Sequence, residues 1–290
     1  AERDFAALRF VQVAEELLEG HRAAMSSGSI AGGAQGSRDA ESSVVLARQA
    51  IDASLGLSSP DVERAQRLLD LLDRLANAGG VDTRGIADEL AYRRFQIALA
   101  RDGIERASEL AAELRSTRSP LANSAERRLF QSARDAWQRD RRDENAIRIV
   151  RFGSLVLAQF DGPPDISTAS VMDAVADAAS FLWQAKQDEV MRDRARSIDR
   201  VLIEQSLASR GAMRRHAELS EAADDPASAL AAWRTLAQAL TPDEDEWYEA
   251  KYNLFRLLAA SDQARAAEAV RQHALLNPDF GPEPWGSRIK

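Results

Sequence analysis

Apolar residues recur at helical spacing along almost the whole chain. Residues 2–24 place six apolar side chains on one such pattern: Phe5, Leu8, Val11, Ala14, Leu17 and Leu18. The same periodicity resumes after residue 37 and continues to about residue 277, and spacing of this kind is typical of amphipathic helices. The sequence lacks the alternation of apolar and polar residues that is typical of a strand. The segment ISTAS at 166–170 is the nearest approach, but it is too short and too polar. We therefore predict an all-α chain.

Several helix boundaries are marked by capping residues. A side-chain oxygen precedes a proline at Ser59-Pro60, Ser119-Pro120, Asp225-Pro226 and Thr241-Pro242, and this order is typical of a helix start. Glu244 lies three residues after Thr241, which suggests a capping box. Helix ends are expected at Gly79-Gly80, Gly103 and Gly211. Loops of about two to six residues would join these helices, and this indicates antiparallel hairpins.

The segment 26–37 interrupts the helical pattern. It is rich in Gly and Ser, and such a segment buries too little apolar surface to offset its chain entropy. The glycines form no phosphate-binding loop, because the first lysine of the chain is Lys186 and no strand precedes them. We predict an N-terminal helix at 1–25 on a flexible linker at 26–37.

The second helices of the predicted hairpins share a packing pattern. A small residue is followed four positions later by a larger one and then by another three positions beyond. The pattern occurs as Ala107/Ala111/Leu114/Pro120, Ala146/Val150/Gly153, Ala195/Asp199/Leu202, Ala229/Trp233/Leu236/Pro242 and Ala266/Val270/His273/Pro278. The small residue lets two helix backbones approach, and a period of this length indicates a helical repeat array.

The segment 226–278 resembles the tetratricopeptide repeat family. Trp247 and Ala250 match its first helix, and the second helix carries Ala266 and Val270 before Asn277-Pro278. Lys251 stands where the family prefers glycine, and His273 stands where it prefers a small residue. The resemblance covers roughly residues 84–278 and is weak at 120–206.

The resemblance implies an α-solenoid of five to six antiparallel helical hairpins over residues 38–278, followed by a capping tail at 279–290. It also implies a protein-interaction scaffold with a concave groove.

Composition excludes several function classes. The 290 residues include no Cys and three His, so thiolate metal sites, iron–sulfur clusters and a cysteine nucleophile are excluded and a zinc site is disfavoured. A net charge of −8 argues against general nucleic-acid binding. Apolar runs fall short of the ~18–20 residues of a membrane-spanning helix. We expect no metal, no cofactor and no catalytic site, with His21, His216 and His273 on the surface or along the groove.

Two charge clusters divide the array. Residues 118–151 contain nine Arg against five acids, whereas residues 218–249 contain nine acids against one Arg. The arginines could bind anions or an acidic peptide, but a solvated face with local pairing is favoured. The acids at 243–246 are explained by the dipole at a helix N-terminus. The opposite charges of the two clusters make head-to-tail self-association conceivable.

Four tryptophans are expected in the core, and one is not. Trp233 and Trp247 match repeat-packing positions, while Trp137 and Trp183 lie in apolar helix stripes. Trp285 lies in a tail whose Pro and Gly residues argue against a helix. Phe280 and Trp285 would therefore either fold back to cap the last hairpin, which we favour, or dock onto another chain.

These observations favour a non-catalytic adaptor that binds a peptide segment or subunit of another protein. Helix phase places five cations along its groove: Arg93, Arg94, Arg134, Lys251 and Arg256. The alternative is a structural subunit that docks onto a neighbour through the N-terminal helix or the C-terminal tail. An enzyme with a site not visible in the sequence is the third hypothesis. The sequence assigns neither a partner nor a compartment.

Overall fold

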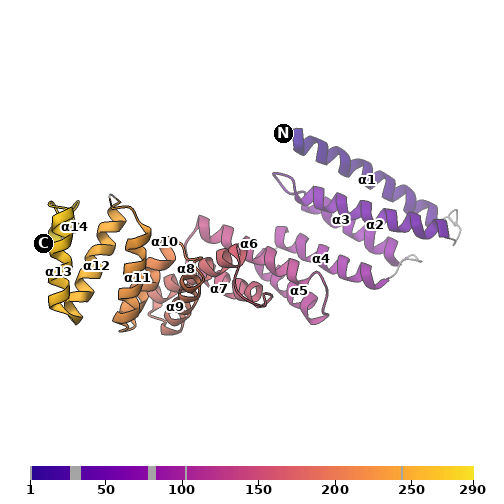
Figure 1. Cartoon of the computed structure of the whole chain (residues 1–290). Helices are drawn as coiled ribbons and strands as arrows, with labels where there is room; N and C mark the ends of the chain where they lie inside the picture. Colours follow the sequence, from indigo (N-terminus) through magenta and orange to yellow (C-terminus); the bar gives the residue numbers. More distant parts are fainter. Residues whose placement is uncertain (1, 27–33, 78–82, 102, 243) are drawn as a thin grey trace. The chain divides into compact units, whose positions relative to one another are not determined.

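The chain is all-helical wherever the structure describes it, which confirms the prediction of an all-α chain. The computed structural model describes residues 2–26, 34–77, 83–101, 103–242 and 244–290, and these form helices without a strand (Figure 1). The helices are α1 (Glu2–Ser26), α2 (Ala34–Leu55), α3 (Val62–Asn77), α4 (Thr83–Arg101), α5 (Ile104–Ser116), α6 (Ala122–Arg139), α7 (Asp143–Leu157), α8 (Ile166–Lys186), α9 (Glu189–Glu204), α10 (Arg210–Ala222), α11 (Pro226–Ala239), α12 (Asp245–Ser261), α13 (Gln263–Leu276) and α14 (Trp285–Ile289). In the described ranges no helix is both long enough and apolar enough to cross a membrane.

The helices form two compact units, Ala1–Ser132 and Ala133–Lys290. Unit 1 contains α1 to α5 and the first part of α6, and unit 2 contains the rest of α6 and all later helices. Consecutive helices pack against one another from α1 to α5 in unit 1 and from α7 to α13 in unit 2. Neighbour-on-neighbour packing is the arrangement that a helical repeat array requires.

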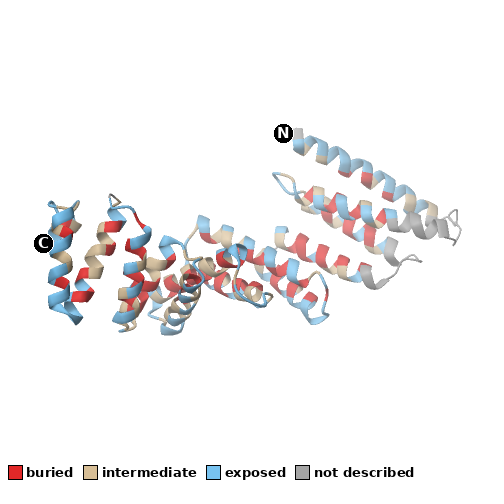
Figure 2. Ribbon diagram, in the orientation of Figure 1, coloured by how far each residue is buried: buried red, intermediate tan, exposed pale blue. Residues whose placement is uncertain are grey.

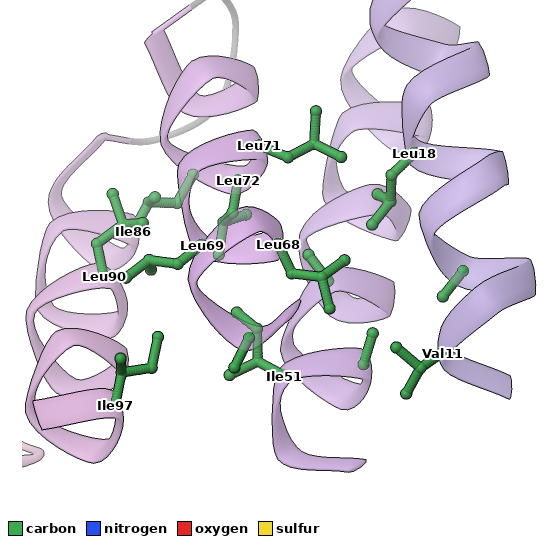
Figure 3. Close-up of a cluster of buried hydrophobic side chains, with 14 residues drawn as sticks. Val11, Leu18, Ile51, Leu68, Leu69, Leu71, Leu72, Ile86, Leu90 and Ile97 are labelled. Carbon is green, nitrogen blue, oxygen red and sulfur yellow. The ribbon is translucent and has the colours of Figure 1, made fainter. Parts of the chain in front are cut away.

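One apolar cluster joins α1, α2, α3 and α4 in unit 1. Val11 and Leu18 on α1 point toward Ile51 on α2 and Leu68 on α3, and all four side chains are fully buried (Figure 3). The N-terminal helix is therefore packed into the unit. Residues 27–33 of the predicted linker lie outside the described residues, but residues 34–37 already belong to α2. Good helix formers around Gly36, such as Ala34, extend the helix into the predicted linker.

Small residues bring the helices together along the array. The repeat alanines Ala107, Ala146, Ala195, Ala229 and Ala266 fall one each on α5, α7, α9, α11 and α13, and all are buried. Buried and exposed residues alternate along the helices of both units (Figure 2). Trp233, Trp247 and Ala250 are also buried, whereas Val270 is half-buried and Pro278 is exposed. Trp137 is buried and Trp183 is half-buried.

Local chemistry explains which helix starts were predicted correctly. Asp225 caps α11 as expected, because its carboxylate accepts the Ser228 backbone N–H at 3.1 Å and Pro226 follows. The predicted starts at Pro60 and Pro120 are each two residues early.

Two other boundary predictions are wrong. The Thr241 hydroxyl donates to the Glu244 carboxylate at 2.7 Å instead of accepting a backbone N–H, and α12 begins at Asp245. Gly211 lies in the first turn of α10 and does not end a helix, because Ser209 caps α10 there.

The C-terminal tail is partly helical, which corrects the expectation from its Pro and Gly content. Pro284 immediately precedes α14, where a proline is tolerated because the first N–H groups of a helix need no partner. The tail folds back onto α12, with the rings of Trp285 and Tyr252 5.7 Å apart. Gly281 allows this return, since its φ is +104° and a Cβ there would lie 2.2 Å from the Tyr248 ring.

Candidate functional site

A polar groove of about 480 Å³ opens in unit 2 where α6, α8 and α10 meet. We call it the α6–α8–α10 groove. Its lining consists of Arg134, Trp137, Gln138, Arg141, Ser170, Asp173, Ala174, Asp177, Ser209, Gly211 and Arg215. These three helices alternate along the chain with α7 and α9, so the groove runs across the first helices of successive hairpins.

One wall of the groove is built around Asp177. The Trp137 Nε1–H donates to its carboxylate at 3.1 Å, and the Arg141 guanidinium forms an ion pair with the same group. Arg141 also lies 4.5 Å from the centre of the Trp137 ring, and Phe181 meets that ring edge-on at 4.9 Å. A cation over an aromatic face is favourable, so four mutually supporting contacts fix this wall.

A second part of the groove lining is held by a buried ion pair. Arg215 donates to both oxygens of Asp199 at 2.5 and 2.9 Å and to Asp173 at 2.7 Å. Burial raises the pKa of Asp199 to about 6, although Arg215 acts to lower it. For Arg215, burial acts to lower the pKa, but the pairs with Asp199 and Asp173 outweigh it and raise the pKa further. At neutral pH both groups are therefore charged.

Arg134 is the groove cation without a carboxylate partner. Its guanidinium donates to the Ser170 hydroxyl at 3.2 Å, and within the described part of the chain no acidic side chain lies within ion-pair distance of it. Arg141 and Arg215, by contrast, are neutralised by Asp177, Asp173 and Asp199. Arg134 is therefore the groove residue at which a ligand carboxylate could form a new ion pair.

The five predicted groove cations are divided between the two units. Arg93 and Arg94 belong to unit 1, and the other three belong to unit 2. The expectation for Arg93 is wrong, because its side chain is 6% exposed and is bound by Glu89 and Asp52. Arg93 has an acid one turn earlier on the same helix, and this pairing offsets part of the cost of burying both charges.

The remaining three predicted cations lie outside the groove. Arg94 is exposed and lies 3.7 Å from Asp73. Lys251 is half-buried over the Trp247 ring at 5.0 Å, and burial lowers its pKa. Arg256 forms an ion pair with Glu221. Only Arg134 among the five lines the α6–α8–α10 groove.

Two of the three histidines are buried, which corrects their predicted positions. His273 is packed 5.5 Å from the rings of both Trp247 and Phe255, and burial lowers its pKa. His216 is also buried, and its pKa is lowered by burial and by Arg196. His21 is half-buried and shares a hydrogen bond of 2.8 Å with Ser43. Across the described residues no group of three or more His, Cys, Asp or Glu could hold a metal ion.

Ion pairs one repeat apart connect the hairpins of unit 2, and the sequence analysis missed them. We call them the inter-hairpin ladder: Arg141–Asp177, Arg215–Asp173, Arg210–Glu244, Arg214–Glu249 and Arg256–Glu221. The partners are separated by 34 to 42 residues. Opposite charges recurring at the repeat period are the signal that could have revealed them. The acidic segment 218–249 therefore supplies partners to neighbouring helices as well as facing the dipole of α12.

Comparisons with known proteins do not assign a family. No family model matches the chain, and no curated protein has a similar sequence. Among solved structures, an "Assembly Chaperone of RpL4 (Acl4) (Residues 1-338)" is similar, with 13% sequence identity, coverage of 95% of this chain and 93% of that chain, and a TM-score of 0.27. A likeness at this TM-score carries no argument, so we infer function from the residues of this chain.

Proposed function

We propose that this protein is a helical-repeat adaptor that binds an acidic peptide segment of another protein in the α6–α8–α10 groove. The observation that carries the proposal is Arg134, a half-buried cation at the groove whose hydrogen-bond partner is a neutral hydroxyl. A carboxylate placed there would gain a charge-assisted hydrogen bond without displacing an existing ion pair. The divergent tetratricopeptide pattern of the second unit supports the same class of function.

The groove also offers a shape suited to an extended peptide. It crosses three helices, and Trp137 provides an aromatic surface beside the polar groups. The ion pairs of Asp177 and Asp199 hold its side chains in place before a ligand arrives. Pre-organised side chains lose less conformational entropy on binding and so favour affinity.

The proposal is tested by selecting binders from a random peptide library on the full chain. We expect the enriched peptides to share an Asp, a Glu or a free carboxyl terminus. Arg134→Ala should weaken their binding by about tenfold or more, since hydrogen bonds to charged groups are worth ~1.5–3 kcal/mol. Arg134→Glu should weaken it further while leaving the thermal unfolding midpoint unchanged.

Arg139→Ala is the matched control for this experiment. Arg139 lies on the same helix, is exposed, and donates to the Asp135 backbone carbonyl. It is not part of the groove lining, so its replacement should leave peptide binding intact. Selection of peptides without a shared acid, or equal loss in the two alanine variants, would contradict the groove assignment.

A second candidate function is a structural subunit of a larger assembly. The C-terminal route would first require release of the tail, because Trp285 is packed against Tyr252 and Phe280 lies against His273. The N-terminal route is favoured by a specific observation, namely that α1 carries exposed apolar side chains.

A further inference from the structure

Helix α1 has two apolar faces, and only one of them is used within unit 1. Val11, Ala14 and Leu18 face α2 and α3 and are buried. On the other side Phe10, Val13 and Leu17 are 38%, 49% and 59% exposed. A single exposed apolar residue is ordinary, but a continuous apolar stripe marks a contact surface.

The exposed residues follow a heptad spacing. Ala6, Phe10, Val13, Leu17 and Gly20 are exposed and alternate in steps of four and three residues, and the half-buried Ala24 continues the spacing. We call this set the outer stripe. Such spacing produces a straight seam along a helix and is the pattern of helices that pack lengthwise on another helix. At Gly20 an added Cβ would meet no atom within 4 Å, so the outer stripe is open to solvent there too.

We propose that the outer stripe pairs with the outer stripe of a second copy of this chain, with the two α1 helices antiparallel. The interaction is independent of the groove in unit 2. A two-fold axis at Val13 would set Phe10 beside Leu17 of the second copy and Ala6 beside Gly20 of the second copy. The large residues then fill the centre of the seam, while the small ones let the helix ends approach closely.

Charge complementarity supports the second copy as the partner. Arg9 and Glu16 are exposed and lie on the same flank of the outer stripe, because they are seven residues, or about two turns, apart. The same axis brings Arg9 beside Glu16 of the second copy, and it does so twice. In a parallel pair Arg9 would instead face the flank that carries Ala14, which is packed within unit 1.

Sedimentation of the full chain over a range of concentrations tests the proposal. The unmodified protein should form dimers, and the double variant Val13→Glu/Leu17→Glu should remain monomeric with unchanged helix content. Leu8→Glu is the matched control, because Leu8 lies nine residues from Leu17, which is half a turn away around the helix. It should leave the dimer intact. A protein that is monomeric at every concentration, or a dimer that survives the double variant, would overturn the proposal.

Charge reversal tests the antiparallel orientation. Arg9→Glu and Glu16→Arg should each weaken the dimer by about tenfold, since each replaces two attractive contacts with two repulsive ones. An equimolar mixture of the two variants should regain the original affinity as a heterodimer. Failure of the mixture to recover would overturn the antiparallel pairing. Binding of a monomeric protein to phosphatidylglycerol vesicles through the outer stripe would overturn self-association in favour of a membrane surface.

Discussion

Asp199 shows how a single side chain can escape a pattern-based prediction. It occupies the position of the repeat where Ala111, Val150 and Trp233 stand in other hairpins, and there an apolar side chain is expected. The structure instead buries its carboxylate fully and matches it with Arg215 from the next helix. The position was identified from the sequence, but its partner was not, because the pair depends on contact between two helices. Arg134 was predicted at a groove, whereas the acids that neutralise its neighbours were not.

Removing the acid of this pair should destabilise the protein strongly. Asp199→Leu leaves Arg215 with a large part of its guanidinium buried and only Asp173 as a counter-charge. We expect a loss of ~3–5 kcal/mol in the free energy of unfolding, the range for breaking a buried ion pair. The double variant Asp199→Leu/Arg215→Met should be more stable than Asp199→Leu alone, as measured by urea unfolding. Equal stability of the two variants would show that the buried charge carries no cost.

The same carboxyl should shape the dependence of stability on pH. The pKa of Asp199 is about 6 in the folded protein against 3.8 ordinarily, so the folded state holds the proton more tightly. The resulting stabilisation is fully present below pH 3.8 and is lost as the pH rises through 6. A difference of ~2 pH units corresponds to ~3 kcal/mol. Asp199→Asn keeps an oxygen that can accept from Arg215 but does not titrate. Relative to this variant, the unmodified protein should therefore gain about this amount of unfolding free energy as the pH falls from 7 to below 4, and parallel curves would contradict the raised pKa.

The helices themselves were largely predictable, and their ends were less so. Periodicity locates a helix because each apolar side chain of one face must be buried, which is a local property of the sequence. The exact start of a helix depends on which side chain accepts hydrogen bonds from its first backbone N–H groups. Asp225 does so, whereas Thr241 binds Glu244 instead. The short helix α14 was missed because its stability comes from α12, which lies in a different part of the sequence.

Gly281 should be essential for the tail to lie on α12. Gly281→Ala adds both a strained φ and a clash with the Tyr248 ring, whereas Gly162→Ala adds strain alone, because φ is +105° there and a Cβ would meet nothing within 4 Å. The strain costs ~1–2 kcal/mol at either position. We expect faster hydrogen exchange over residues 279–290 in Gly281→Ala only. Equal effects of the two variants would mean that the close approach to Tyr248 adds nothing.

At the scale of the whole molecule, the repeat pattern did not predict the division into two compact units. The repeat pattern predicted one continuous array over residues 38–278, and sequence periodicity gives no sign of a boundary at residue 132. The sequence repeat reflects packing between neighbouring helices. It does not show where packing between successive helices becomes sparse enough to separate two units. In arrays whose elements contact mainly their neighbours, stability is a sum of local terms.

Core truncations should therefore act within their own unit. Leu68→Ala removes a fully buried side chain of unit 1, and Leu236→Ala removes one from the core of unit 2. Each should cost ~2–5 kcal/mol. Hydrogen exchange should accelerate over α2–α4 in the first variant and over α10–α12 in the second. Acceleration over the whole chain in either variant would show that the two units unfold together.

The inter-hairpin ladder also determines how such an array can grow. Arg210 and Arg214 on α10 form ion pairs with Glu244 and Glu249, one repeat later. Glu244 immediately precedes α12, and Glu249 lies on it. Suppose that the α10–α11 hairpin were duplicated in tandem. Arg210 and Arg214 of the first copy would then face the same two arginines of the second copy instead of Glu244 and Glu249. Like charges would then face each other at both contacts, and that junction would be disfavoured. The hairpins are therefore not interchangeable, because the positions of their positive and negative side chains determine which hairpin can follow which along the chain.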